Sequence, residues 1–514
     1  MLAKLYPPTN LPTYYRDLYR SQYHADLANG TVRPLTIPYS LLGCLLPVFY
    51  LTIPHRRRPW LYRSRFLVVL AMILFNIDVV FWRRTSSANF AGSYATGLTC
   101  AWGTIWGITL LLVMNVQGGV ARIAMRRQTD PNRDYVKEVA YVPDESIRTA
   151  IKQGWEYYWQ PYPEDAPFTT RLGWVWNLYT SFRGAGWSFA IPTIPHPPPP
   201  TNISSSPPVV FTPSSFRPHP TGSSISPTHS SFIRSRLFDI FWTYLALDLW
   251  TVTARYDTYF VPGPGVSLPP ANIPIPPSLV PFSHTLLSAL GILSALIHYL
   301  SLFQLLSYLL TRPPHRQLHQ YPSPFGSLLA LPRRGLPGVW SSFWHQSFRL
   351  GFTFPTFLLP SSLPRHHPLR TITTTLSAFL LSGLLHAAGG FTCPAGPVAA
   401  KTQWWMPVGF FLAQFVGVTV QAVGAWVVPR RVGRGVRGVG NTLFALGWLH
   451  VTNWMLIGDF SRAGLWLFEP LPVSVVRLVG WGPEGEGWWR WDGSFLPGWT
   501  AGMGGRWWEG GVRL

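Results

Sequence analysis

Long apolar runs are the feature that most constrains how this chain can fold. A helix needs roughly 20 apolar residues to cross a bilayer. Eight stretches approach that length, at 37–54, 66–82, 95–116, 237–254, 284–310, 371–389, 404–428 and 441–458. These runs are too long for barrel strands, and apolar and polar residues do not alternate within them. The pattern therefore predicts an all-α, polytopic integral membrane protein, a helical bundle with about eight transmembrane helices.

The charge content supports a membrane protein and argues against a nucleic-acid partner. Only 12% of the 514 residues are charged, about half the share usual in soluble domains. The net charge of +21 comes almost entirely from arginines that lie beside apolar runs. Such placement is typical of membrane topology rather than of a groove that follows phosphates.

The distribution of arginine predicts the orientation. Under the positive-inside rule, loops rich in Arg and Lys face the cytosol. Four such loops fall on one side of an eight-span map, at 55–65, 121–127, 311–370 and 428–440, whereas the alternate loops are much poorer. We therefore expect those four loops in the cytosol and a multi-pass protein of the endoplasmic reticulum.

Composition divides the chain into four regions. Residues 1–130 hold three predicted spans, and 131–236 form a cytosolic loop. Within that loop, 192–230 are rich in Pro and Ser, which predicts an extended, poorly ordered insert. Residues 237–460 hold the remaining spans, and the Gly- and Trp-rich 461–514 are expected at the membrane–water interface.

A histidine inside a predicted span is a candidate for chemistry, because ionisable groups are costly within a bilayer. His386 lies in "LSGLLHAAGG", with Ser382 and Gly383 one turn earlier on the same helix face. Small residues there would let a neighbouring helix or a thin substrate chain approach. An imidazole suits proton transfer at neutral pH. The alternative is a structural histidine that bonds a carbonyl of a neighbouring helix.

A second polar group precedes the apolar "LGFTFPTFLLP". In "GVWSSFWHQSFR", Trp340, Trp344, His345, Gln346 and Arg349 lie close together. If the segment is helical, His345 and Arg349 share one face. The guanidinium of Arg349 suits phosphate groups, but an interfacial Trp–Arg anchor would have the same composition.

Other polar residues favour structural roles. Asp248, in "YLALDLWTV", is expected to pair with an Arg or a backbone donor, and His298 and His450 are expected to be packing histidines. The three cysteines are far apart, and no HExxH pattern occurs, so no metal site is predicted.

Ordered motifs identify a resemblance. The chain resembles fungal wax-synthase-domain proteins, which are related to membrane-bound O-acyltransferases and include acetyltransferases of terpenoid and meroterpenoid biosynthesis. The resemblance is carried by Trp340 and Trp344-His345-Gln346 with Arg349, by the lone His386 about forty residues later, and by Arg183-Gly184-Ala185-Gly186-Trp187 upstream. The helix with Asp248 is also similar. Ser341-Ser342 stand where the family usually has Gly-Arg.

The resemblance implies an activity and a site. An acyl group, acetyl above all, would pass from acyl-CoA to a hydroxyl of a lipophilic acceptor, with no bound cofactor and no covalent enzyme intermediate. His386 would be the general base, and His345 would orient the substrate or stabilise the oxyanion. The CoA-binding group would comprise Trp344, Gln346, Arg349, Arg183 and Trp187, supported by Trp340, Ser382, Gly383 and Asp248.

Two other functions fit parts of the pattern. A long-chain wax or sterol ester synthase would share the site and differ in the width of the acyl tunnel. A non-enzymatic transporter would leave both histidines structural, but no inverted repeat or pair of broken helices supports it. One tension stands: on a simple eight-span map, His386 lies near the far end of its helix, away from cytosolic His345.

Overall fold

Helices make up nearly all of the regular structure in a computed structural model of the chain, so the predicted all-α fold class is confirmed. The structure describes residues 10–128, 142–217, 219–261, 275–360, 362–364, 367–394, 403–427, 433–491, 498–500 and 511–513.

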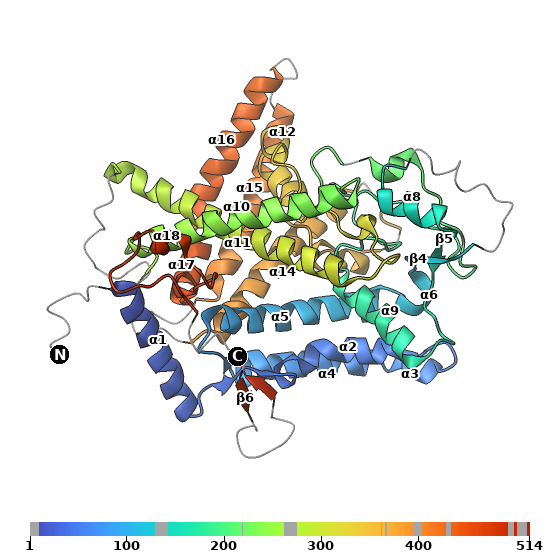
Figure 1. Ribbon diagram of the computed structural model, residues 1–514, viewed down its shortest axis with the longest axis horizontal. Coiled ribbons are helices and arrows are strands. Elements are labelled where there is room, and N and C mark those ends of the chain that lie inside the picture. The colour runs from blue at the N-terminus through green and yellow to red at the C-terminus, as the bar shows by residue number, and fades with distance from the viewer. Residues whose placement is uncertain are drawn as a thin grey trace.

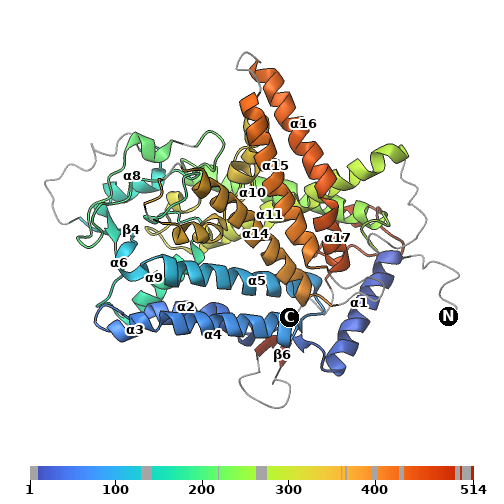
Figure 2. The ribbon, with the colours of Figure 1, turned by 180° about the vertical axis from the view of Figure 1, so that it is seen from behind.

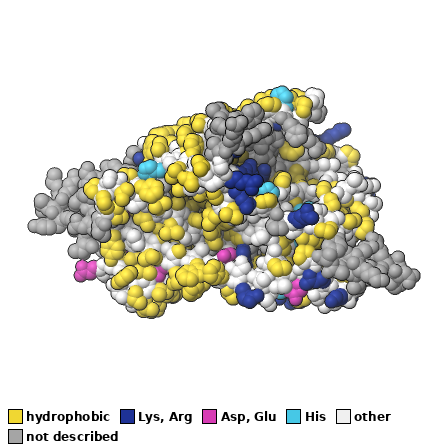
Figure 3. Space-filling view, turned by 90° about the horizontal axis from the view of Figure 1, so that it is seen from above, with side chains coloured by type: hydrophobic (Ala, Val, Ile, Leu, Met, Phe, Trp, Pro, Cys, Tyr) yellow, Lys and Arg dark blue, Asp and Glu magenta, His cyan; other side chains and the backbone are white. Residues whose placement is uncertain are grey.

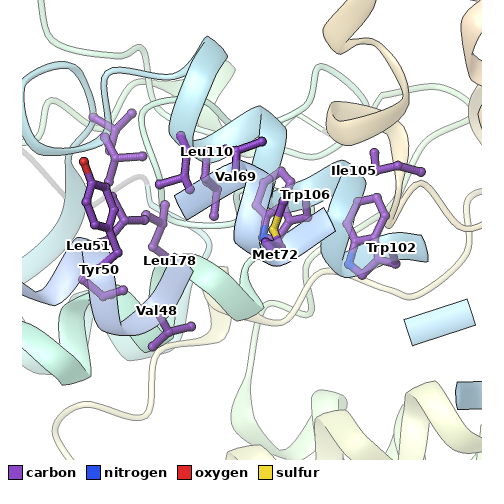
Figure 4. Packing of buried hydrophobic residues seen from close by; sticks show 14 of the residues in the cluster. Val48, Tyr50, Leu51, Val69, Met72, Trp102, Ile105, Trp106, Leu110 and Leu178 are labelled. Carbon is purple, nitrogen blue, oxygen red and sulfur yellow. The ribbon is translucent and has the colours of Figure 1, made fainter. Parts of the chain in front are cut away.

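The N-terminal helices form one layer. α2 (Leu42–Thr52), α4 (Arg65–Ile77) and α5 (Phe90–Ile108) lie side by side (Figure 1). α4 and α5 each end in a π-helical turn, η3 (Asp78–Trp82) and η4 (Thr109–Val113). α9 (Phe168–Thr180) packs against α2. The core between them contains the fully buried Met72 and Trp106, which lie against each other in Figure 4.

Five long helices and the short α17 form the rest of the bundle. They are α10 (His229–Arg255), α11 (Val280–Leu310), α14 (Pro368–Thr392), α15 (Trp405–Val427), α16 (Arg434–Thr452) and α17 (Trp454–Arg462). α10 packs along α11, and α14 packs between α5 and α15. α15 and α16 extend beyond the rest of the molecule in both ribbon views (Figure 1, Figure 2).

Short helical pieces precede α14. They are α12 (Ala330–Gly338), the π-helical η8 (Val339–Phe343), α13 (Arg349–Phe352) and the 3-10 turn η9 (Phe354–Leu358). α12 packs against α15 and α16, whereas α13 packs against α5 and α14. This broken stretch therefore runs along the bundle helices and carries His345 to α14.

The remaining elements connect or flank the bundle. The helices are α1 (Leu11–Ala28), α3 (Pro59–Arg63), α6 (Val116–Gly119), α8 (Glu145–Lys152) and α18 (Val475–Leu478), with 3-10 turns η2 (Tyr39–Leu41), η5 (Pro213–Phe216), η6 (Pro277–Leu279), η7 (Leu318–Gln320) and η10 (Leu465–Leu467). β1 (Arg33–Pro34) runs parallel to β3 (Thr85–Ser86). β4 (Arg122–Arg127) and β5 (Trp155–Gln160) are antiparallel, and β7 (Gly511–Arg513) pairs with both β2 (Thr36–Ile37) and β6 (Gly498–Thr500).

Each of the eight predicted apolar runs lies largely in helix, but the count of eight spans is not confirmed. Among the described residues, five helical stretches are long and apolar enough to cross a membrane, at Arg65–Trp82, Phe90–Val113, Pro277–Leu310, Pro368–Thr392 and Trp405–Ala425. The helix at Tyr39–Thr52 is apolar but short, and the run at 441–458 is divided between α16 and α17. Hydrophobic side chains cover much of the face seen in Figure 3, as a surface in contact with lipid requires.

The described part of the Pro- and Ser-rich insert lies against the rest of the protein. Among the described residues between 192 and 228, regular structure is limited to the short turn η5 and an isolated bridge at Pro208. Ile194 and Phe211 are buried, and Tyr157 of β5 contacts the Phe211 ring edge-on. The apolar residues scattered among the prolines supply this packing, and the low-complexity composition conceals them.

Buried ion pairs fix the C-terminal region to the bundle. Glu486 accepts from Arg255 of α10 at 3.0 Å and from Arg477 of α18 at 2.8 Å. Glu469 pairs with Arg490 and with Arg16 of α1. Because these groups are almost fully buried, each charge depends on its partners to offset the loss of hydration.

α5 and α14 approach so closely that their backbones touch. A Cβ at Gly97 would lie only 1.9 Å from the Ala388 carbonyl oxygen. The Thr392 hydroxyl accepts from the Gly97 amide at 3.1 Å and donates to the Ser93 carbonyl at 2.7 Å. This contact between small residues fixes how α14 lies against α5.

Gly97→Ala tests the importance of that approach. The added methyl group must push the helices apart, and we expect a loss of about 1–3 kcal/mol of stability. Gly424→Ala is the control, since nothing lies within 4 Å of a Cβ there, and it should be neutral or stabilising by up to about 1 kcal/mol. Thermal unfolding in detergent measures both, and an unchanged midpoint for Gly97→Ala would contradict the packing described.

Candidate active site

The segment 338–349 is not one continuous helix, because a tight turn follows the π-helical η8. After η8 the backbone becomes extended at Trp344, and the Trp344 amide donates to the Val339 carbonyl at 2.8 Å. The side-chain Nε2 of Gln346 donates to the backbone carbonyls of Trp340 at 2.9 Å and Trp344 at 2.6 Å. His345 and Arg349 therefore do not share one face of a continuous helix, which corrects the helical alternative considered for this motif.

Arg349 reinforces the same turn. Its guanidinium donates to the Ser341 carbonyl at 3.0 Å and to Gln346 Oε1 at 3.2 Å. Burial, together with the charge of Arg334, lowers the Arg349 pKa. Arg349 therefore shapes the loop that presents His345, and it keeps part of its surface accessible.

His345 lies in an aromatic enclosure. Its ring contacts Phe325 and Phe348 edge-on and Trp344 at a tilt. Its Nδ1 is buried without a hydrogen-bond partner among the described residues. Burial, followed by the nearby His386 and Arg183, lowers the His345 pKa to about 3, so the ring is neutral at physiological pH.

His386 is held between aromatic rings at the centre of three helices. The imidazole stacks on Phe411 of α15, with ring centroids 5.1 Å apart and planes at 15°. Phe460 of α17 and Tyr94 of α5 contact the same ring at a tilt. His386 nevertheless retains some accessible surface.

The two histidines lie in the same part of the bundle although 41 positions separate them in the sequence. His386 is close enough to act electrostatically on His345. Aromatic contacts also connect them, because Trp340 touches both Trp344, beside His345, and Phe411, beside His386. The broken segment runs along the bundle to α14, which Trp340 touches at Phe379, so the motif with His345 is not separated from this helix as the span map suggested.

The upstream motif is a rigid support. Gly184 and Gly186 have φ of 67° and 74°, a region that favours glycine and explains both glycines of the motif. Arg183 donates to the carbonyls of Ser323 at 2.7 Å and Pro322 at 2.8 Å and to the Ser223 hydroxyl at 3.2 Å. Trp187 is 1% exposed and donates to Asn177. Arg183 thereby fixes the loop at Pro322 and Ser323, which leads to Phe325 and then to His345.

The predicted supporting residues lie in different parts of the bundle and make different contacts. Gly383 permits a close approach of α15, because a Cβ there would lie 2.7 Å from Val408 Cα. Ser382 is half-buried on α14. Asp248 accepts from the Ser474 hydroxyl at 2.6 Å and the Val476 amide at 2.9 Å, so it pairs with a backbone donor as expected. His298 and His450 bond Thr243 and Thr285.

Residues that the sequence analysis missed complete the surroundings of His386. Tyr94 and Phe411 come from other helices, α5 and α15, and neither stands in a motif. The small residues of "FAGSYATG" around Tyr94 indicate a close helix contact, but the sequence does not show with which helix. Among the described residues, no group of three or more His, Cys, Asp or Glu could hold a metal ion.

The stretch of chain that carries the two histidines resembles a known class, the polytopic, membrane-bound O-acyltransferases. Residues 321–413, the stretch that contains both histidines, match the model of the Membrane bound O-acyl transferase family. The predicted resemblance is therefore confirmed, and with it the integral membrane character of the chain.

A curated relative gives a more particular likeness. Over 334 residues the chain is 25% identical to the O-Mevalon transferase yanI of Aspergillus niger. The alignment covers 62% of this chain and 65% of that relative, just under two thirds of its length. Both comparisons support a transferase over a transporter. No solved structure matches the chain.

Arg183→Lys tests the supporting role of the upstream motif. An ammonium cannot reproduce the fork that serves two carbonyls and a hydroxyl, so we expect a loss of about 1.5–3 kcal/mol of stability. Arg333→Lys is the control, because Arg333 bonds the Pro220 carbonyl at an exposed site and should change stability by less than about 0.5 kcal/mol. Equal thermal midpoints for the two variants in detergent would contradict this role.

Proposed function

We propose that this protein transfers an acyl group from acyl-CoA to the hydroxyl of a lipophilic acceptor, a fungal terpenoid or meroterpenoid. The observation that carries the proposal is the pair His345 and His386, linked by a chain of aromatic contacts inside an apolar bundle. An acceptor that dissolves in the bilayer reaches such a site from the lipid. Acyl-CoA reaches it from the cytosolic side of the endoplasmic reticulum membrane.

His386 is the general base in this reaction. Its ring takes the acceptor's hydroxyl proton as the oxygen attacks the thioester carbonyl, forming a tetrahedral intermediate. The intermediate collapses with cleavage of the carbon–sulfur bond, and the departing thiolate takes the proton back from the imidazolium. No acyl-enzyme forms, so one histidine serves both proton transfers.

His345 stabilises the oxyanion. A neutral imidazole carries one N–H, and the enclosure by Phe325, Trp344 and Phe348 keeps that donor away from water. A pre-oriented donor in such surroundings stabilises developing negative charge more strongly than water does. The low pKa of His345 supports this role, because the ring does not compete with His386 for the proton.

The acyl-CoA donor is defined by the length of the acyl group that it carries. We favour acetyl, and a long-chain acyl group would make the protein a wax or sterol ester synthase. The name of the Aspergillus relative, O-Mevalon transferase, supports testing a mevalonyl donor as well. Microsomes supplied with acetyl-, mevalonyl- and palmitoyl-CoA and a terpenoid alcohol distinguish these donors by the ester formed.

His386→Ala is predicted to abolish acyl transfer while the protein still accumulates in membranes. The substitution removes the base and leaves the helix contacts of Gly97 and Thr392 in place. Ester formation from labelled acyl-CoA in microsomes measures the effect, with His450→Ala as the control for loss of a bundle histidine that bonds Thr285 instead. Normal turnover in His386→Ala would remove this residue from the mechanism.

Arg349→Ala separates a role in CoA binding from a role in loop shape. If the guanidinium meets the CoA phosphates, the KM for acyl-CoA should rise about tenfold or more while the KM for the acceptor stays nearly constant. If it only braces the turn through Ser341 and Gln346, kcat should fall and both KM values should stay level. We expect the first pattern; the second would confine Arg349 to the loop.

A further inference from the structure

Tyr94 makes two contacts with His386 through a single hydroxyl. Its oxygen lies 3.0 Å from His386 Nδ1 and 3.1 Å from the His386 carbonyl oxygen. Both partners belong to one residue of α14, whereas Tyr94 comes from α5. The hydroxyl therefore bonds the ring and the backbone of the candidate base at the same time.

A count of protons determines which atom donates in each contact. A tyrosine hydroxyl carries one hydrogen, and a carbonyl oxygen can only accept. The hydroxyl hydrogen must therefore point at the His386 carbonyl, since two oxygens 3.1 Å apart would otherwise repel each other. The remaining contact is then made by a hydrogen on Nδ1, which donates to a lone pair of the hydroxyl oxygen.

We infer that Tyr94 is a positioning residue that holds His386 as the Nδ1–H tautomer and leaves Nε2 with the lone pair that accepts the acceptor's proton. The inference rests on the proposed function, because it assigns the base nitrogen of that reaction. The hydroxyl also stabilises the imidazolium formed during the reaction, because the charged ring donates more strongly from Nδ1.

The surrounding packing leaves Tyr94 little freedom. A Cβ at Gly389 would lie 2.8 Å from the tyrosine ring, so only glycine admits the ring at that point of α14. Phe460 contacts the ring edge-on, with centroids 5.5 Å apart. One turn along α5, Gly97 lies against the backbone of Ala388. The hydroxyl is thus held in register with His386 by the helix contact itself.

Tyr94→Phe removes the hydroxyl and keeps the ring that packs on Gly389 and Phe460. We expect kcat to fall about 10- to 100-fold, the range for loss of a partner that orients a histidine, with both KM values changed less than about twofold because no substrate contact is lost. The acidic limb of the kcat–pH profile should move to lower pH, since the imidazolium loses its acceptor. The other titratable groups around this pair are His345, Cys393, Asp459 and Arg462, and the substitution alters none of them.

Tyr299→Phe is the matched control. It removes a hydroxyl that donates to the Pro470 carbonyl at 2.7 Å, away from His386. This variant should lose no more stability than Tyr94→Phe and should keep the wild-type kcat and pH profile. Equal kcat values and superimposable pH profiles for wild type and Tyr94→Phe would overturn the inference.

A chemical probe decides the same question without acyl transfer. Diethyl pyrocarbonate modifies an imidazole nitrogen that carries a lone pair, and mass spectrometry of the peptide containing His386 measures its rate. In Tyr94→Phe the Nε2–H tautomer is no longer disfavoured, so modification at Nε2 should slow severalfold relative to wild type and Tyr299→Phe. Equal rates would overturn the tautomer assignment. An inactive wild-type protein in which the rates still differ would refute the proposed function and uphold the contact.

Discussion

The close contact between α5 and α14 is the constraint on which the rest of the site depends. Gly97 removes the side chain that would separate the two backbones, and Thr392 bridges the Ser93 carbonyl and the Gly97 amide. This contact prevents α14 from sliding along α5 and from rotating about its own axis. His386 can then stack on Phe411 without adjustment, and its surroundings are formed before substrate arrives.

The second constraint is the enclosure of polar groups by aromatic rings. His345 has three aromatic neighbours, and His386 also has three, from α5, α15 and α17. Rings of this size exclude water and supply few hydrogen bonds of their own. The two imidazoles therefore keep nitrogen atoms available for substrate. Arg183, Gln346 and Arg349 stabilise the connecting chain by binding its carbonyls.

Sequence reasoning found the helices and the histidines because both leave local signals. Apolar runs have a length set by the bilayer, and an imidazole within such a run stands out. The same reasoning could not bring His345 and His386 into one part of the bundle, because the π-turn and the extended residue at Trp344 depend on hydrogen bonds from the Gln346 side chain that residue composition does not reveal. Tyr94 was also beyond it, since the pairing of α5 with α14 joins residues almost 300 positions apart. Composition also gave no sign that Ile194 and Phe211 of the Pro- and Ser-rich insert are buried, because it averages over single apolar residues.

The decisive measurement is a cryo-electron microscopy structure in lipid nanodiscs with a non-hydrolysable acyl-CoA analogue. The account predicts that the carbonyl carbon of the analogue lies between the rings of His345 and His386. Its oxygen should lie within hydrogen-bonding reach of His345, and an acceptor hydroxyl should fit within reach of His386. An analogue seated elsewhere in the bundle, with closed hydrocarbon packing between the two rings, would contradict the account.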